Sequence, residues 1–225
     1  LDFWVSTDHA EALTPRKWKS IKDAVRSCNE PTDAQEPDLV TFLGYEWTQV
    51  GTDAESHYGH KNVMFLDIDE DKTPKRAIGA GGVATNGMRN TLPGQATMLR
   101  PAAFLDFENR HRYYNFISFA QELQGGAFCE EGISSELLDE NCYESADTPQ
   151  DLFRKLNEIN LPAIVIPHGN TWGFYTPSES SWDKQLSKEQ NRSDKQISFE
   201  IMSGHGNSEE YRPWSASITE NNVQF

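Results

Sequence analysis

The sequence predicts an α/β fold, because short apolar runs typical of buried strands alternate with segments of helical periodicity. Two Thr-Pro pairs, Thr14-Pro15 and Thr148-Pro149, have the residue types that favour a helix N-terminus. The chain has 225 residues, of which 36% are hydrophobic, and this is enough for one large domain with its own core. We therefore expect a single α/β domain over residues 1–225, with much of its sheet parallel.

The N-terminal part is expected to form a strand, a helix and two further strands. Residues 1–5, Leu-Asp-Phe-Trp-Val, have the composition of a strand that is already under way at the first residue. Apolar residues then repeat at helical spacing from Trp18 to Val25. The apolar run at 39–43 is typical of a strand covered on both faces, and residues 62–68 form the next predicted strand. The abrupt start suggests that the chain is the middle of a longer protein.

The C-terminal part repeats the same alternation. Leu152, Leu156 and Ile159 lie on one face of the helix predicted after the second Thr-Pro pair. Residues 163–166 then form a buried strand, and residues 197–201 form the last one.

Two polar segments interrupt this alternation. Residues 69–94, which include the stretch "GAGGVATNG", are polar and rich in glycine, and residues 178–194 are polar. We predict that both are loop insertions outside the core.

The charge of the chain restricts its partners. Lys and Arg number 20 and Asp and Glu number 35, which gives a formal charge of -15. A field of this sign repels the phosphates of nucleic acids and anionic membrane surfaces. No apolar run approaches the roughly 20 residues needed to cross a bilayer. We therefore expect a small molecule as the partner, with no nucleic acid and no membrane span; the oligomeric state is left open.

The three cysteines, Cys28, Cys129 and Cys142, are too few for a disulfide scaffold and lack the C-x-x-C spacing of structural zinc sites. Cys129 and Cys142 could close a short loop in an exported protein, whereas three reduced thiols would suit a cytosolic one. Both alternatives stay open, with a periplasmic or secreted location slightly favoured.

Histidines and carboxylates follow the predicted strands at their ends. Asp8 and His9 follow the first strand, and Glu46 follows the second. His168 follows the strand at 163–166, and His205 comes shortly after the last predicted strand. Because the strand ends of parallel α/β folds meet at one face, we expect these side chains to lie close together.

Two further histidines, His57 and His60, precede the strand at 62–68 instead. If this strand returns antiparallel beside the one that ends at Glu46, His60 comes close to that carboxylate. Imidazole nitrogen and carboxylate oxygen suit Zn, Mn or Fe, whereas Ca favours oxygen alone. Bound cations would also reverse the local field, so that an acidic chain can accept an anionic substrate. The pattern therefore predicts a divalent metal site.

Each of these residues also has a structural interpretation. A single histidine at a strand end is more often hydrogen-bonded than metal-bound, and Asp8 could cap a turn. The stretches "PHGN" and "GHGN" are typical of tight turns, where glycine supplies a positive φ. Five of the six histidines, all but His111, lie beside strand ends or in turns that contain glycine. This shared location favours a common site.

Five motifs in this order carry a family resemblance: "STDH", "GYEW", "HYGHKNV", "IPHGNTWG" and "SGHGNSEEYR". From Phe3 to Trp214 the chain resembles the DUF-3604 family (a domain of unknown function) of the polymerase and histidinol phosphatase (PHP) superfamily. The resemblance implies a distorted (β/α)7 barrel that holds two or three divalent metal ions, usually Zn, Mn or Fe. It also implies that the barrel is incomplete here, because the H-x-H and D-x-H motifs of the superfamily do not occur in the chain.

The resemblance implies roles for particular residues. The expected metal ligands are His9, Glu46, His60 and His168. His60 is preferred to His57 because Lys61-Asn62-Val63 leads directly into the strand. The expected catalytic residues are His205, His168 and Asp8. Residues expected to contact substrate or to orient the ligands are His57, Asn170, Asn207, Glu200 and Glu209, with Glu200 or Glu209 orienting His205.

The function implied is hydrolysis of phosphomonoesters or phosphodiesters by metal-activated water. Two alternatives stay open. One is hydrolysis of another ester or of an amide on the same metal cluster. The other is a non-catalytic exported domain that binds glycans through its Trp- and Tyr-rich loops. A segment without the terminal ligands should bind metal poorly, so the activity of these 225 residues alone is also open.

Overall fold

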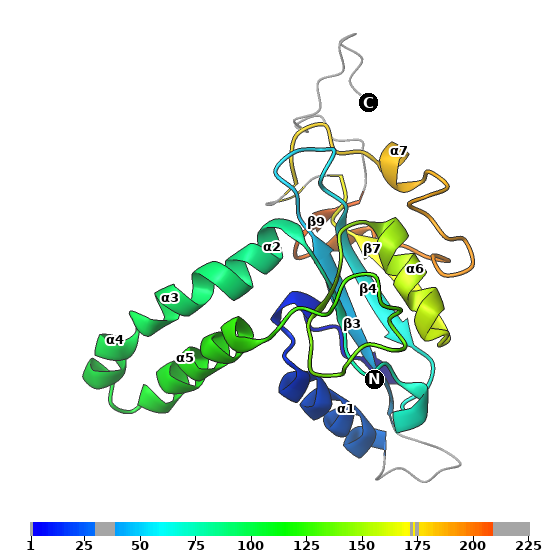
Figure 1. Ribbon diagram of the computed structural model, residues 1–225. Helices are drawn as coiled ribbons and strands as arrows, with labels where there is room; N and C mark the ends of the chain where they lie inside the picture. Colours follow the sequence, from blue (N-terminus) through cyan, green and yellow to red (C-terminus); the bar gives the residue numbers. More distant parts are fainter. Residues whose placement is uncertain (1, 30–38, 172, 174–175, 209–225) are drawn as a thin grey trace.

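The computed structural model describes residues 2–29, 39–171, 173 and 176–208. These residues form a mixed α/β body from which a long helical arm projects (Figure 1). The strands are β1 (Phe3–Val5), β2 (Val40–Phe42), β3 (Gly44–Gln49), β4 (Gly59–Phe65), β5 (Ile78–Ala80), β6 (Glu144–Ala146), β7 (Ala163–His168), β8 (Met202–Ser203) and β9 (Gly206–Asn207).

The helices lie in the body and in the arm. The body contains the short turns η1 (Ala10–Ala12) and η2 (Glu70–Lys72) and the helices α1 (Pro15–Asn29), α6 (Pro149–Ile159) and α7 (Trp182–Gln185). The arm consists of α2 (Gly82–Asn86), the π-helical turn η3 (Gly87–Thr91), α3 (Leu92–Thr97), α4 (Arg100–Leu105) and the returning helix α5 (Arg110–Gly125).

The central sheet has the strand order β3-β4-β7, and both of its pairings are antiparallel. The pairs β1-β2 and β5-β6 are parallel. The α/β class is therefore confirmed, but the expectation of a largely parallel sheet is wrong for the central strands. The connection between β3 and β4 is too short for the crossover of a dozen or more residues that a parallel pairing needs. The predicted antiparallel return beside Glu46 is confirmed by the β3-β4 register.

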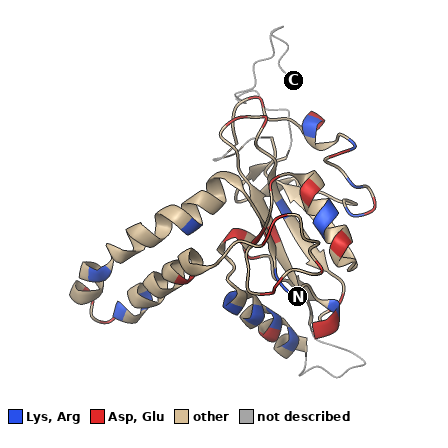
Figure 2. Cartoon of the chain, viewed as in Figure 1, with Lys and Arg blue, Asp and Glu red and all other residues tan. Residues whose placement is uncertain are grey.

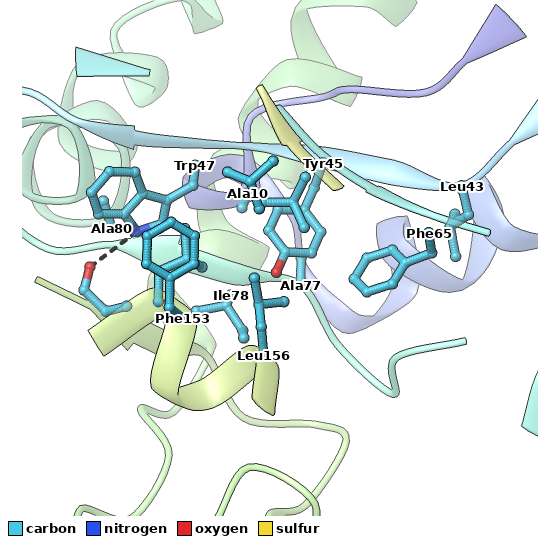
Figure 3. Packing of buried hydrophobic residues seen from close by; sticks show 14 of the residues in the cluster. Ala10, Leu43, Tyr45, Trp47, Phe65, Ala77, Ile78, Ala80, Phe153 and Leu156 are labelled. Atoms are coloured by element: carbon cyan, nitrogen blue, oxygen red, sulfur yellow. Dashed lines mark hydrogen bonds between the residues drawn. The ribbon is translucent and has the colours of Figure 1, made fainter. Parts of the chain in front are cut away.

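Alternation along these strands turns one face of the sheet to the core and places a group of polar residues on the other face. Tyr45, Trp47 and Val63 point into the core and are fully buried. Figure 3 shows Phe153 and Leu156 of α6 packed against this face. The indole N–H of Trp47 donates to the carbonyl of Ala146 at 3.0 Å, so the polar atom of this side chain is satisfied. The even-numbered residues face the other way, and four of them at one end of the sheet, Glu46, Thr48, His60 and His168, belong to the site described below.

Both predicted helices begin where the Thr-Pro pairs place them. The Oγ1 of Thr148 accepts from the N–H of Asp151 at 3.2 Å and caps α6. The Oγ1 of Thr14 accepts from the N–H of Lys17 at 3.2 Å at the start of α1. Trp18 of α1 is buried, and its indole N–H donates to the carbonyl of Pro74 at 2.9 Å.

Two predicted segments, 69–94 and 197–201, differ from the structure, and a third, 178–194, differs only in a short helix. Residues 69–94 are not a loop throughout, because Ile78 and Ala80 of β5 are fully buried in the core and the arm begins at α2. β5 is retained in the core by its parallel pairing with β6. Residues 178–194 are mostly turns, with the short helix α7 among them. Residues 197–201 form no strand, although the N–H of Glu200 donates to the carbonyl of Pro167 at 3.0 Å beside β7.

A disulfide joins Cys129 and Cys142 and closes the loop between α5 and β6. Cys28 is a free and exposed cysteine. Among the residues described, no helix combines the length and the apolar character that crossing a bilayer requires.

Candidate metal centre

The polar face of the central sheet brings together residues that are far apart in the sequence. The registers place Thr48 opposite His60 and His60 opposite His168. Glu46 lies two residues before Thr48 on the same strand and therefore on the same face. Three adjacent strands thus direct a carboxylate and two imidazoles to one point.

A fourth side chain comes from outside the sheet. His205 lies in the turn between β8 and β9, and its ring stacks on that of His60 with centroids 4.0 Å apart and planes 11° apart. One potential ligand atom from each of Glu46, His60, His168 and His205 lies within 4.8 Å of the other three. We call these four residues the Glu46 cluster. It could hold a metal ion.

The carboxylate of Glu46 is the centre of this cluster. Its Oε1 lies 2.6 Å from His60 Nδ1 and 3.4 Å from His168 Nε2. The same oxygen lies 3.5 Å from His205 Nε2 and 3.7 Å from His9 Nδ1. One anionic oxygen is therefore shared by four imidazole rings.

The protonation states suit metal binding. Burial raises the pKa of Glu46, but hydrogen bonds with His168 and His60 and the proximity of His9 outweigh it, so this pKa lies well below its usual range. Burial lowers the pKa of His60 to about 4, although Glu46 acts in the opposite direction. Burial also lowers the pKa of His205. At neutral pH the carboxylate is therefore ionised and these two imidazoles are neutral, and these are the forms that bind metal ions.

His9 and Asp8 lie at the edge of the cluster. His9 pairs with Glu46 in an isolated parallel bridge, its side chain is 33% exposed, and its Nδ1 lies 2.7 Å from Thr48 Oγ1. Asp8 is exposed, and its carboxylate accepts from the hydroxyl of Ser6 at 2.9 Å. The structure thus places His9 beside the four grouped ligands and Asp8 outside them, where it fits its alternative interpretation as a turn residue.

His57 and Glu200, expected at the periphery of the site, occupy different positions. His57 is buried but is not part of the Glu46 cluster, and burial lowers its pKa to about 4. The structure thus brings His60, and not His57, into the cluster. Glu200 Oε2 lies 3.6 Å from His168 Nδ1, so the residue expected to orient His205 lies beside His168 instead.

Asn170 and Asn207 support the surrounding backbone. The amide of Asn170 is buried within 3.1 Å of the carbonyl oxygens of Tyr58 and His168. The carbonyl of Asn207 accepts from the hydroxyl of Thr171 at 2.9 Å. Glu209 lies outside the described residues, as do the aromatic residues Trp172, Phe174 and Tyr175 of the predicted substrate loop.

Sequence reasoning missed two residues, Thr48 and Glu11. Thr48 Oγ1 lies 3.3 Å from His60 Nδ1 and 3.4 Å from Glu46 Oε1. Its position two residues after Glu46 was the available signal. Glu11 is fully buried, and its Oε1 accepts from the backbone N–H groups of Thr48 and Ala80. Burial raises the pKa of Glu11 to about 7. Glu11 thus connects β3 to β5 directly behind His9.

Gly169 allows His60 and His205 to approach each other. Its φ is +61°, and a Cβ at this position would lie 3.3 Å from His60 Cδ2 and 3.4 Å from His205 Cβ. We predict that Gly169→Ala lowers the free energy of unfolding by about 1–3 kcal/mol through backbone strain and weakens metal binding. Urea denaturation and metal titration check both effects.

Gly94→Ala is the matched control. Gly94 lies inside α3 with open space around its Cα, so alanine there should leave stability unchanged or raise it by up to about 1 kcal/mol. Equal stability of the Gly169→Ala variant and the wild type would contradict the role assigned to this glycine.

The donor set of the Glu46 cluster, three imidazoles and one carboxylate, fits a borderline divalent ion such as Zn, Mn or Fe. Compared with known protein families, curated proteins and solved structures, the chain matches none. The site's own geometry is therefore the basis for the proposals that follow.

Proposed function

We propose that the protein is a metal-dependent hydrolase, and that its substrate is a phosphomonoester or phosphodiester. The observation that carries this proposal is the buried Glu46 cluster, whose ligand atoms lie within 4.8 Å of one another at the face of a rigid sheet. Mixed nitrogen and oxygen ligands of this kind are typical of hydrolytic Zn, Mn and Fe sites.

Glu46, His60 and His168 would hold the ion, and their burial keeps them in place and largely out of water. A divalent cation there would polarise the phosphoryl group and activate a water molecule for attack at phosphorus. The other residues have complementary tasks. Thr48 fixes the ring of His9 through the 2.7 Å contact, and Glu200 faces the outer nitrogen of His168.

His205 is the proposed acid–base residue: its neutral imidazole would take a proton from the attacking water and then donate it to the leaving group. Its side chain is 28% exposed, against 4% for His168, so its ring reaches both the Glu46 cluster and the solvent side of the site. A general acid needs this position, because it must contact the bound substrate while remaining near the reacting bond. His168, the other catalytic candidate, is assigned to the metal instead.

We also propose that the chain belongs to a distorted (β/α)7 barrel of the PHP type and to the DUF-3604 family. Support comes from the motifs that carry the resemblance: Glu46, His60, His168 and His205 derive from four of them, and His9 from the fifth. These residues meet at one site. In a complete barrel the cluster would hold two or three ions.

An exported location, in the periplasm or outside the cell, is proposed on the Cys129–Cys142 disulfide. Disulfides persist in oxidising compartments and are rare in the cytosol. Thiol titration of the protein purified without reductant, before and after reduction, checks this pairing in solution. One free thiol rising to three is the expected result.

Chelation tests the proposed reaction. We expect hydrolysis of a generic phosphomonoester or phosphodiester to stop when the metal is removed and to return when Mn or Zn is added. A parallel panel of carboxyl esters, amides and sulfate esters separates the phosphoesterase from other hydrolases on the same site. Full activity in the presence of chelator would contradict the proposal.

Acidification should release the ion. The pKa of His60 is about 4, so its imidazole stays neutral at pH values well below the ordinary histidine pKa of about 6.5. Protons therefore compete with the metal ion for this imidazole only near pH 4. We therefore expect metal content, measured after dialysis at a series of pH values, to persist to about pH 5 and to fall steeply near pH 4. Loss of the ion with a midpoint above pH 6 would show that ordinary exposed histidines bind it.

A further inference from the structure

The outer end of the helical arm exposes an unusual apolar surface. We define residues 98–112 as the arm tip, where α4 turns into α5. Four of its side chains, Met98, Phe104, Leu105 and Phe107, are between 66% and 83% exposed. The small core of the arm, formed by Ala96, Ile117 and Ala120, does not cover them. Several large exposed apolar side chains within one short segment are typical of an interaction site.

The charges of the arm differ from those of the rest of the chain. The arm, residues 82–125, contains four arginines, no lysine and three carboxylates, a net charge of +1 within a chain of formal charge -15. Arg100, Arg110 and Arg112 lie at the tip, where Figure 2 shows basic residues at the outer end of the arm. The guanidinium of Arg110 lies 3.9 Å from the ring centroid of Phe107. Protein interfaces are enriched in aromatic residues, Met and Arg and depleted in Lys, and the arm tip has this composition.

A complementary surface lies on the same chain. We define residues 128–142 as the acidic loop, which the Cys129–Cys142 disulfide closes at its base. It carries five carboxylates and no Lys or Arg: Glu130, Glu131, Glu136, Asp139 and Glu140. All five are exposed, and none of them forms an ion pair with another part of the chain that the structure describes. Phe128 and Leu137 add exposed apolar area beside these carboxylates.

The tip cannot reach the acidic loop of its own chain. The loop begins three residues after α5 ends, and residues 113–125 of α5 separate it from the tip by about 20 Å. The arm projects away from the body, as Figure 1 shows. The two surfaces can therefore meet only between two molecules.

We propose that two copies of this chain form a dimer in which the arm tip of each copy binds the acidic loop of the other. Phe104, Leu105 and Phe107 would pack against the apolar residues of the loop, while the three arginines pair with its carboxylates. Each copy then contributes one arm tip and one acidic loop to the contact, and both surfaces are covered in both copies. A two-fold symmetric dimer requires this reciprocity. Complementary charge also favours this occupant over an anionic membrane, which the acidic body repels.

Sedimentation equilibrium of the whole chain over a concentration series tests the proposal. We expect the wild type to dimerise, and Phe104→Ser with Leu105→Ser to raise the dimer dissociation constant by about 30-fold or more. Arg100→Glu with Arg110→Glu should weaken the dimer as well. Lys19→Glu with Lys188→Glu is the matched control, since both lysines are exposed and lie outside the two surfaces. It should leave the dimer intact.

A charge exchange makes the assignment specific. Adding Glu130→Lys, Glu131→Lys, Glu136→Lys and Glu140→Lys to the Arg100→Glu and Arg110→Glu chain should restore the dimer, because a loop that has become basic then meets a tip that has become acidic. A monomeric wild type, or no rescue by the exchanged chain, would overturn the proposal. A monomeric wild type that floats with phosphatidylserine vesicles would also overturn the proposal, if the Phe104→Ser and Leu105→Ser changes abolish this flotation. The tip would then bind lipid.

Discussion

Glu46→Gln is expected to lower the affinity for Zn or Mn by about 100-fold or more, and to remove hydrolytic activity with it. The substitution keeps the shape of the side chain but removes the anionic oxygen that four histidines approach within 3.7 Å. Changes in residues that only support metal ligands already cost about 10–100-fold in affinity, so loss of the central ligand should cost at least as much. Competition with a chromophoric chelator measures the affinity.

Two variants accompany this measurement. Glu200→Gln, which changes only the carboxylate beside His168, should lower the affinity by about 10-fold. Glu55→Gln changes an exposed carboxylate outside the cluster and should have no effect. If Glu46→Gln binds metal as tightly as Glu55→Gln does, the ion is held elsewhere on the molecule.

Trp47→Ala is expected to lower the free energy of unfolding by about 3–5 kcal/mol. The side chain is fully buried between the central sheet and α6, where Figure 3 shows it beside Phe153. Its removal leaves a large cavity and takes the hydrogen-bond donor away from the carbonyl of Ala146. Urea denaturation followed by circular dichroism gives the difference.

The control for this change is Leu186→Ala, at a residue that is 60% exposed and should contribute less than about 0.5 kcal/mol. Trp47→Phe keeps most of the apolar volume but loses the N–H donor. Its loss of unfolding free energy should therefore lie between those of Trp47→Ala and Leu186→Ala. A cost for Trp47→Ala no larger than that for Leu186→Ala would mean that the sheet and α6 do not pack as described.

Local chemistry made the two long helices of the body, α1 and α6, predictable. Thr14-Pro15 and Thr148-Pro149 combine a capping hydroxyl with a residue that has no N–H to satisfy, and apolar residues follow at helical spacing. The strand direction was harder to predict, because apolar runs look alike in parallel and antiparallel sheets. β5 was missed because a strand of three residues, Ile78–Ala80, leaves no period to detect within a glycine-rich stretch.

The site was predicted better than the sheet that carries it. Glu46, His60 and His168 stand next to strand ends in the sequence, and the antiparallel pairing brings their side chains to one face. His205 was expected at the site, although its own strand was misplaced. Glu11 gave no signal, because its role depends on backbone N–H groups that only the fold brings to its carboxylate, those of Thr48 and Ala80.

Anomalous X-ray diffraction from crystals of this chain grown with Zn tests the central claim most directly. We predict an anomalous peak within about 2.0–2.2 Å of ligand atoms from Glu46, His60 and His168, with His205 beside it. A fully occupied ion at another place, or no peak at these side chains under saturating Zn, would contradict the account.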